Sequence, residues 1–393
     1  MHRKVAANGN EAIANAMRIA NPDVCGAYPI TPATEIMQRF TTFVSNGKVK
    51  TEMVLAESEH SAMSACIGAA AAGGRVATAT SSQGMALMWE MLFIASGLRL
   101  PIVMGMANRA LSAPINIHGD HSDGMGARDC GWIHLYCENA QEAFDNMLMA
   151  FKLAEHMDVR LPVMVGMDGF ITSHAIQTME WIDDETAANF IGEYKSTNPL
   201  LDIKNPVSYG PLILADLYME YRKAQEHVMS GVPKVVLDIA KEFEQISGRK
   251  YGLFEEYRLD DAEVAIVVMS SAAGTTKEII DQFREKGIKV GLLKPRLFRP
   301  FPYAEVGEAL KHLKAVAVLD RADCFGGSHG PLYVDIASAL YNYAQRPVLI
   351  NKIFGLGGRD YMPDHAEYVI NELLQIAKDG NVKLVKEYIG VRE

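Results

Sequence analysis

The chain has 393 residues, enough for two or three domains, and its 49% hydrophobic and 22% charged residues are typical of a globular protein with a large core. Its net charge of −10, without a basic stripe, excludes nucleic acid as the default partner, because phosphate binding relies on clustered Lys and Arg. The N-terminus lacks a signal-peptide core and no apolar stretch could span a membrane, so we expect a cytoplasmic protein. The five cysteines are dispersed and form no C-x-x-C pair, which suits a reducing compartment and argues against a ferredoxin-type iron–sulfur cluster.

The first elements lead to a stiff loop. Apolar residues three and four apart predict a helix over 10–20, and a short buried strand follows over 24–28. The strand ends in Tyr28-Pro29-Ile30-Thr31-Pro32, where the two prolines restrict the backbone and exclude regular structure. Taken alone, this loop is an ordinary strand exit with Thr31 as the N-cap of a helix over 33–45.

The most unusual stretch runs from residue 56 to 84. A helix of mostly small residues begins near Glu57 and Glu59, and a β-branched strand over 76–80 follows it. Small side chains allow another backbone or a flat cofactor to approach closely. The strand delivers Ser81-Ser82-Gln83-Gly84 to a strand-to-helix turn, where α/β proteins usually bind ligands. The pattern predicts the wall of a cofactor pocket with one carboxylate directed into it.

A second candidate site follows the apolar strand over 100–107. Arg109 lies just past its end, where it is either a surface residue or a clamp for a carboxylate. The next loop carries His118, Asp120, His121 and Asp123. These side chains could suggest a metal site, but the loop lacks helical or strand periodicity, which favours a loop that covers a substrate.

The remaining elements complete two α/β units. A helix over 141–156, a strand over 161–167 and an alternating pattern before them predict a doubly wound parallel sheet. Residues 198–209 are typical of a linker, and 212–245 predict a long helix interrupted near Gly231-Val-Pro233. Strands over 264–269, 289–294, 315–319 and 348–353, with a helix over 277–286, predict a second unit. We therefore divide the chain into domains 1–245 and 246–393.

Several separate segments together resemble one family. They are AYPITP (27–32), ESEHSA (57–62), TSSQG (80–84), NRALSAPINI (108–117), GDHSD (119–123), DGF-x-TSH (168–174) and LFRPFP (297–302). In this order they resemble the α subunit of 2-oxoacid:ferredoxin oxidoreductases, which are thiamine-diphosphate enzymes of the pyruvate:ferredoxin oxidoreductase type. The match covers nearly the whole chain. It implies a pyrimidine-binding α/β domain followed by a domain like the C-terminal domain of transketolase.

The resemblance also implies roles for individual residues. Glu59 would hydrogen-bond the N1′ nitrogen of the thiamine aminopyrimidine and favour the tautomer that accepts the proton from thiazolium C2; from the residues alone, a glutamate stabilised by the helix dipole is an equal reading. Thr31 and Arg109 would hold the substrate carboxylate, and His118 and Asp120 would belong to the substrate loop. The other cofactor-binding residues implied are Tyr28, Pro29, Ile30, Ser82, Gln83 and Gly84.

The chain lacks the G-D-G…N segment that anchors Mg²⁺ and the diphosphate in thiamine enzymes. We therefore expect half an active site and no metal site here. A β subunit would carry the thiamine diphosphate and Mg²⁺ half-site, and iron–sulfur clusters would lie on partners that include γ and ferredoxin-like δ subunits.

The function expected is oxidative decarboxylation of a 2-oxo acid, pyruvate favoured, with CoA to acyl-CoA and CO₂, with electrons passing to ferredoxin. A threonine at position 31 argues against oxalate, because a related oxalate-using enzyme carries a basic residue there. Alternatives are phenylglyoxylate, a branched-chain 2-oxo acid or 2-oxoglutarate as substrate, and NAD as acceptor through a flavin subunit. A non-catalytic scaffold subunit and a transketolase-like enzyme without redox partners are further alternatives.

Overall fold

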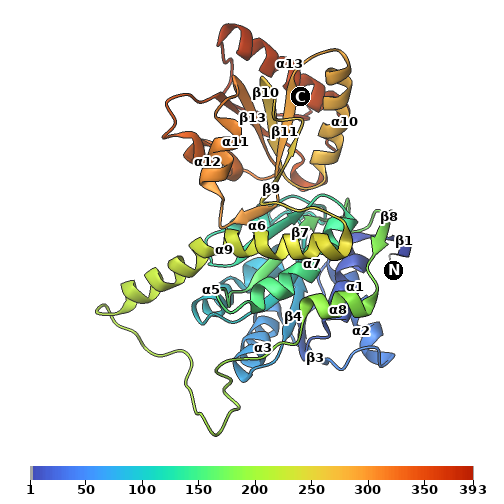
Figure 1. Cartoon of the computed structure of the whole chain (residues 1–393), viewed down its shortest axis with the longest axis vertical. Coiled ribbons are helices and arrows are strands. Elements are labelled where there is room, and N and C mark those ends of the chain that lie inside the picture. The colour runs from blue at the N-terminus through green and yellow to red at the C-terminus, as the bar shows by residue number, and fades with distance from the viewer. Residues whose placement is uncertain (1–2, 393) are drawn as a thin grey trace.

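The computed structural model describes residues 3–392, which form two α/β domains stacked along the long axis of the molecule (Figure 1). In this part of the chain, no helix is both long and apolar enough to cross a bilayer. The N-terminal domain is built on a sheet of seven strands in the order β12-β6-β7-β5-β4-β2-β3. The strands are β2 (Val24–Ala27), β3 (Glu52–Leu55), β4 (Val76–Thr80), β5 (Ile102–Asn108), β6 (Ile133–Cys137), β7 (Val163–Asp168) and β12 (Leu297–Arg299).

Helices cover both faces of this sheet. Its central strands β4, β5 and β7 are buried along their whole length, as expected for parallel strands between two helical layers. One face packs on α1 (Gly9–Ala20), α2 (Thr34–Ser45), α7 (Ala140–Glu155), α8 (Asp184–Ile191) and α9 (Tyr218–Ser247). The other packs on α3 (Glu59–Ala72), α4 (Ser82–Leu87) and α5 (Trp89–Gly97). The predicted doubly wound parallel sheet is confirmed.

The C-terminal domain repeats the plan with six strands in the described chain, in the order β15-β14-β13-β10-β11-β9. The strands are β9 (Phe254–Tyr257), β10 (Val264–Val268), β11 (Val290–Pro295), β13 (Ala315–Asp320), β14 (Val348–Ile353) and β15 (Lys386–Tyr388). Helices α10 (Ala272–Glu285) and α13 (Pro363–Asp379) cover one face, and α11 (Tyr303–Leu310) and α12 (Pro331–Leu340) cover the other. All pairings are parallel except that of β9 with β11.

One segment crosses the boundary between the two domains. The short β12, which lies in the C-terminal half of the sequence, pairs antiparallel with β6 at the edge of the N-terminal sheet. Separately, β1 (Arg3–Ala7) pairs antiparallel with β8 (Gln177–Trp181) as a two-stranded sheet. A division at residues 245 and 246 stays a prediction, because β12 ties the second part of the sequence to the first sheet.

Two expectations about α9 are wrong. The helix begins at Tyr218 rather than at Leu212, and it runs without interruption through Pro233. Pro233 removes one backbone hydrogen bond, but Val232, Val236 and Phe243 are buried in the core, and this packing keeps the helix continuous. Figure 1 shows the first part of α9 inclined to the rest, as expected of a helix with an internal proline.

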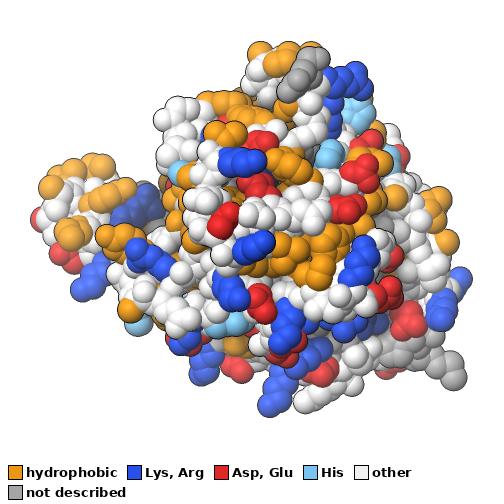
Figure 2. Space-filling model, turned by 90° about the horizontal axis from the view of Figure 1, so that it is seen from above, with side chains coloured by type: hydrophobic (Ala, Val, Ile, Leu, Met, Phe, Trp, Pro, Cys, Tyr) orange, Lys and Arg blue, Asp and Glu red, His pale blue; other side chains and the backbone are white. Residues whose placement is uncertain are grey.

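An irregular segment before α9 extends away from the N-terminal domain (Figure 1). We call residues 193–217 the arm. The arm and the first residues of α9 expose the large apolar side chains of Leu201, Ile203, Leu212, Leu214, Leu217 and Met219. Figure 2 shows hydrophobic side chains on this protruding part, at the left of the molecule.

Candidate active site

Four chain segments meet at the carboxyl edge of the N-terminal sheet. They follow β2, β4, β5 and β7, which are parallel neighbours in the sheet, so their ends lie side by side. These ends carry Thr31, Ser82, Arg109 and Asp168. The topology thus brings together at one edge the three segments that the sequence analysis proposed as site segments. It adds a fourth segment, at Asp168, to which the sequence analysis gave no role.

Glu59 is the first residue of α3, and Ser58 caps the helix by accepting a hydrogen bond from the Ser61 backbone N–H. Its side chain is buried, with the residue 7% exposed, and it lies against Gly84, where an added Cβ would come within 2.8 Å of Glu59 Oε1. Within residues 3–392, its carboxylate makes no hydrogen bond or ion pair. A largely buried carboxylate without a donor is costly, so a donor supplied from outside this chain would be stabilising at this position.

The turn after β4 adds further unpaired groups. The hydroxyls of Thr80 and Ser81 are buried and have no hydrogen-bond partner in the described chain. Ser82 adopts a positive φ of 46°, and its hydroxyl donates to the Ala110 carbonyl at 2.5 Å. Gln83 donates from its amide to Ser112 Oγ at 2.7 Å. The side chains of Ser82 and Gln83 thus tie this turn to the segment that follows Arg109.

Asp123, on the short helix α6 (Ser122–Gly126), organises this edge of the sheet. Its Oδ2 accepts the backbone N–H groups of Ser82 at 2.9 Å and Arg109 at 2.8 Å. Its Oδ1 accepts from Asn108 Nδ2 at 2.9 Å and from the Gly124 N–H. Burial raises the pKa of Asp123 to about 6, although these hydrogen bonds oppose the shift. One carboxylate therefore fixes the exits of two strands.

Arg109 and Thr31 lie together, and their contact uses the Thr31 backbone. Arg109 is 6% exposed and donates from Nη1 to the Thr31 carbonyl at 3.0 Å and from Nε to the Asn116 carbonyl at 2.8 Å. Burial lowers the pKa of this guanidinium, and Asp123 partly offsets that effect. Two neutral carbonyls orient the guanidinium without neutralising it, so it keeps the charge needed to bind an anion.

The substrate-loop residues divide into one exposed and one buried side chain. His118 is exposed and packs its ring 5.0 Å from that of Phe170, measured between centroids. Asp120 is buried, and its Oδ1 accepts from Ser122 while its Oδ2 accepts from the Gly357 N–H at 3.1 Å. In the described chain, no three of the loop's histidines and aspartates converge as metal ligands.

Tyr28, Pro29 and Ile30 follow β2 directly, so they lie at the same edge of the sheet as Ser82 and Arg109. Tyr28 and Ile30 are half-buried, and Pro29 is exposed. Their assignment to a cofactor stays a prediction.

Sequence reasoning missed a buried ion pair that joins the two domains. Asp168, at the end of β7, contacts Arg321 Nη1 at 3.0 Å and His121 Nε2 at 2.7 Å, and it accepts hydrogen bonds from Ser271. Burial alone would raise the pKa of Asp168, but Arg321, His121 and Ser271 outweigh it and hold the pKa well below its usual range. Asp168 could have been suspected from its position after a buried strand. No sequence signal marks Arg321.

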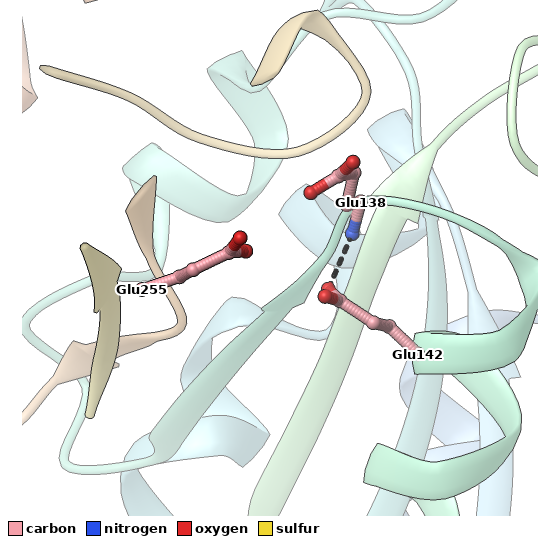
Figure 3. Close-up of side chains that lie close together, drawn as sticks. All are labelled: Glu138, Glu142 and Glu255. Atoms are coloured by element: carbon pink, nitrogen blue, oxygen red, sulfur yellow. Dashed lines mark hydrogen bonds between the residues drawn. The ribbon is translucent and has the colours of Figure 1, made fainter. Parts of the chain in front are cut away.

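A second interdomain cluster holds three glutamates, Glu138, Glu142 and Glu255, whose carboxylates lie close enough to share an ion (Figure 3). Lys294 is buried among them, with Nζ at 2.7 Å from Glu138, 2.6 Å from Glu142 and 2.8 Å from Glu255. Lys277 adds a second ammonium at 2.7 Å from Glu138. The lysines supply the positive charge here, so the cluster is an ion-pair network between domains.

Comparison with known proteins gives two matches to family models. Residues 15–241 match the family described as "Pyruvate flavodoxin/ferredoxin oxidoreductase, thiamine diP-bdg", and residues 262–366 match "Pyruvate:ferredoxin oxidoreductase core domain II". Among curated proteins, the chain is 52% identical to pyruvate synthase subunit PorA of Thermotoga maritima, covering 99% of this chain and 98% of that one. It is 46% identical to PorA of Methanocaldococcus jannaschii (98% and 97% covered) and 41% identical to ketoisovalerate oxidoreductase subunit VorA of Pyrococcus abyssi (99% and 98%).

Solved structures share the fold at low sequence identity. A 2-oxoglutarate:ferredoxin oxidoreductase from Magnetococcus marinus superposes with a TM-score of 0.75 at 21% identity, and the match covers 95% of this chain but only 65% of that one. A split-gene transketolase superposes with a TM-score of 0.56 at 11% identity, covering 95% of this chain and 100% of that one. The predicted order of a thiamine-enzyme domain and a transketolase-like C-terminal domain is confirmed at the level of fold.

Proposed function

The chain belongs to the 2-oxoacid:ferredoxin oxidoreductase family as an α-type subunit, and from this premise we propose how its site works. The assembled enzyme oxidatively decarboxylates a 2-oxo acid, pyruvate favoured, and transfers the acyl group to CoA while two electrons pass to ferredoxin. One observation carries the assignment of the site to this chain. Glu59, a residue 7% exposed, has a carboxylate with no hydrogen bond or ion pair within residues 3–392, and it lies at the same sheet edge as the Arg109 guanidinium, which makes its side-chain hydrogen bonds to two neutral carbonyls.

The residues around Glu59 fit the aminopyrimidine half of thiamine diphosphate. The bare backbone of Gly84 leaves room beside Glu59 that a Cβ would fill, and the Thr80 and Ser81 hydroxyls nearby have no partner in the described chain. When bound, thiamine diphosphate supplies the nucleophilic carbon and the electron sink for decarboxylation. Glu59 would hold or release a proton at the pyrimidine N1′ atom, and its burial would exclude water from that exchange.

Arg109 would bind the carboxylate of the 2-oxo acid. Thr31 and Asn116 occupy its Nη1 and Nε with neutral carbonyls, which leaves further N–H groups for a charge-assisted contact. The Thr31 residue is exposed, and its hydroxyl would add a second contact to the same carboxylate. His118 and Asp120 would shape the loop over the substrate, His118 at its exposed side and Asp120 by anchoring it to Gly357.

The rest of the active site would come from partner subunits. We place the diphosphate and Mg²⁺ on a β subunit, because this chain lacks the sequence that anchors them, and iron–sulfur clusters on γ- and δ-type partners, because its cysteines are dispersed. Four of the five cysteines are buried and none is paired, which fits a cytoplasmic enzyme. The exposed apolar residues of the arm support assembly, since free monomers seldom expose such clusters.

The test is made on the complex purified anaerobically with its partner subunits. A panel of 2-oxo acids is supplied with CoA and a viologen dye, and the rate of dye reduction is recorded. Fast reduction with pyruvate supports the leading assignment. Reduction only with 2-ketoisovalerate, the substrate in the name of the VorA relative, would keep the chemistry and change the substrate. No reduction with any acid, despite bound thiamine diphosphate, would favour a scaffold role.

A further inference from the structure

A turn of the C-terminal domain lies against the loop that follows Arg109. This turn is the 3₁₀ segment Leu356–Gly358 with Gly355 before it, and we call it the glycine turn. Gly355, Gly357 and Gly358 have φ values of 64°, 59° and 81°, a conformation that side chains other than glycine rarely adopt. Two glycines of the turn also approach the loop very closely. An added Cβ would come within 2.4 Å of Asn116 Nδ2 at Gly357 and within 2.3 Å of His118 Cβ at Gly358.

Asn116 is the residue that connects the glycine turn to Arg109. Its side-chain Nδ2 donates to the Gly357 carbonyl at 2.9 Å, and its Oδ1 accepts the His118 backbone N–H at 2.8 Å. Its own backbone carbonyl accepts from Arg109 Nε at 2.8 Å. Asn116 is half-buried. Its Nδ2 binds the C-terminal domain, its Oδ1 binds the substrate loop and its backbone carbonyl binds the Arg109 guanidinium.

The glycine turn is itself anchored in the interdomain contact. Arg321 donates from Nε to the Gly355 carbonyl at 3.2 Å and forms the ion pair with Asp168. The turn also holds the far end of the loop, since the Gly357 N–H donates to Asp120. Both ends of the five-residue segment 116–120 are thus fixed to the C-terminal domain.

We propose that Asn116 is a positioning residue, through which the glycine turn of the C-terminal domain sets the orientation of the Arg109 guanidinium toward the substrate. The proposal rests on the proposed role of Arg109. The carbonyl of Asn116 fixes Nε of Arg109, so when the loop loses its link to Gly357 the guanidinium is held firmly only by the Thr31 carbonyl and can tilt about that contact. A misoriented guanidinium binds the substrate carboxylate less well, while the chemistry at the cofactor is unaffected once substrate is bound.

The test uses the assembled holoenzyme and steady-state kinetics with pyruvate, CoA and a viologen dye. Asn116→Ala removes the amide and keeps the backbone carbonyl, and we expect KM for the 2-oxo acid to rise about tenfold, the effect of one lost hydrogen bond, with kcat within about twofold. Asn116→Asp places an oxygen against the Gly357 carbonyl and should do the same. Asn15→Ala is the matched control, because Asn15 Nδ2 donates to the Glu11 carbonyl at 2.9 Å in α1, far along the chain from Arg109. Its KM should equal that of the wild type.

A double variant separates positioning from general loop damage. Gly357→Ala places a methyl group against Asn116 Nδ2 and should also raise KM about tenfold. In Asn116→Ala/Gly357→Ala the strain of an alanine at a φ of 59° remains, but both substitutions break the same link between Asn116 and Gly357, so we expect KM to exceed that of the single variants by no more than about twofold. Multiplying effects, or an unchanged KM in Asn116→Ala while Arg109→Leu raises it, would overturn the positioning role alone. An unchanged KM in Arg109→Leu would overturn the proposed function of Arg109, and the positioning role with it.

Discussion

The ion pair between Asp168 and Arg321 predicts a pH-dependent loss of stability on substitution of the arginine. Both side chains are almost fully buried, at 0% and 1% exposed, and their closest atoms are 3.0 Å apart. Arg321→Met keeps most of the apolar stem and removes the charge. Asp168 then remains buried with His121 and Ser271 as its partners.

The loss of stability in Arg321→Met is set by the Asp168 charge, which stays buried without its arginine partner. Removing one partner of a buried ion pair costs about 3–5 kcal/mol, because the other charge stays out of water. Unfolding entropy scales with chain length, so for 393 residues that unfold together this lowers Tm by about 4–6 °C. The loss should be measured by thermal denaturation of the purified complex at pH 8.

The sign of the pH dependence is specific to this mechanism. In the wild type the pKa of Asp168 is depressed, so its contribution to stability is present above the pKa of the unfolded state and is lost only in strong acid. In Arg321→Met the cation that most lowers the pKa of Asp168 is gone while burial still raises it, so we expect this pKa to lie higher than in the wild type. The variant can then neutralise Asp168 by taking up a proton, and its deficit in Tm should shrink between pH 8 and pH 5.

Two variants control the interpretation. Arg346→Met removes an exposed arginine and should change the free energy of unfolding by no more than about 0.5 kcal/mol. Arg321→Met/Asp168→Asn removes both charges and should recover most of the lost stability. An Arg321→Met deficit no larger than that of Arg346→Met, or one equal at pH 8 and pH 5, would refute the reasoning.

Three further predictions concern the site itself. Glu59→Gln should leave assembly and Tm unchanged and lower turnover by about 100-fold or more in the viologen assay, because proton exchange at the pyrimidine loses its acid; wild-type rates would contradict this role. Arg109→Leu should raise KM for every 2-oxo acid by at least about tenfold, because a charge-assisted contact is lost, and an unchanged apparent affinity would mean that Arg109 does not touch the substrate. The pKa of Asp123 is raised to about 6, and a protonated oxygen cannot accept both strand-exit N–H groups, so kcat/KM should fall as the pH drops through about 6; a flat profile from pH 8 to 5 would contradict this.

The strands and the edge that carries the site could be predicted because they depend on local pattern. Continuous apolar runs identified the buried strands around residues 100–107 and 161–167, and a β-branched run identified the strand over 76–80. The family resemblance gave Thr31 and Arg109 one shared role, and parallel strands, whose carboxyl ends meet at one edge, bring the two residues together, joined by a hydrogen bond. The topology of the sheet explains why the two residues lie at one edge, but it does not tell which of their atoms form the hydrogen bond.

The predicted start and the predicted interruption of α9 were wrong because both features depend on tertiary packing. Leu212 and Leu214 continue the apolar pattern of α9, but both are exposed and lie before the helix begins. The sequence alone predicts that Pro233 interrupts the helix, but its neighbours pack against the core and keep the helix continuous. A pattern shows which residues are apolar and not which surface will bury them.

The contacts between the two domains could not be predicted from sequence patterns, because they too depend on tertiary packing. Asp168 and Arg321 are 153 positions apart, as their numbers show, and neither lies in a motif that names its partner. Gly357 lies in the glycine-rich segment Gly355-Leu-Gly-Gly358, whose spacing matches no dinucleotide-binding turn. Its function in the fold is a close approach to Asn116, which becomes visible only when the two domains are placed together.

These contacts change what the C-terminal domain does for the site. An N-terminal domain on its own would keep Glu59, since Ser58 caps its helix and Gly84 lies beside it within the same domain. It would lose the Gly357 and Arg321 contacts that hold the loop around Asn116 and His121. The cofactor-facing carboxylate is therefore built locally, whereas the orientation of the substrate-facing guanidinium depends on both domains. The geometry of substrate binding is accordingly the part of the site most sensitive to any movement between the domains.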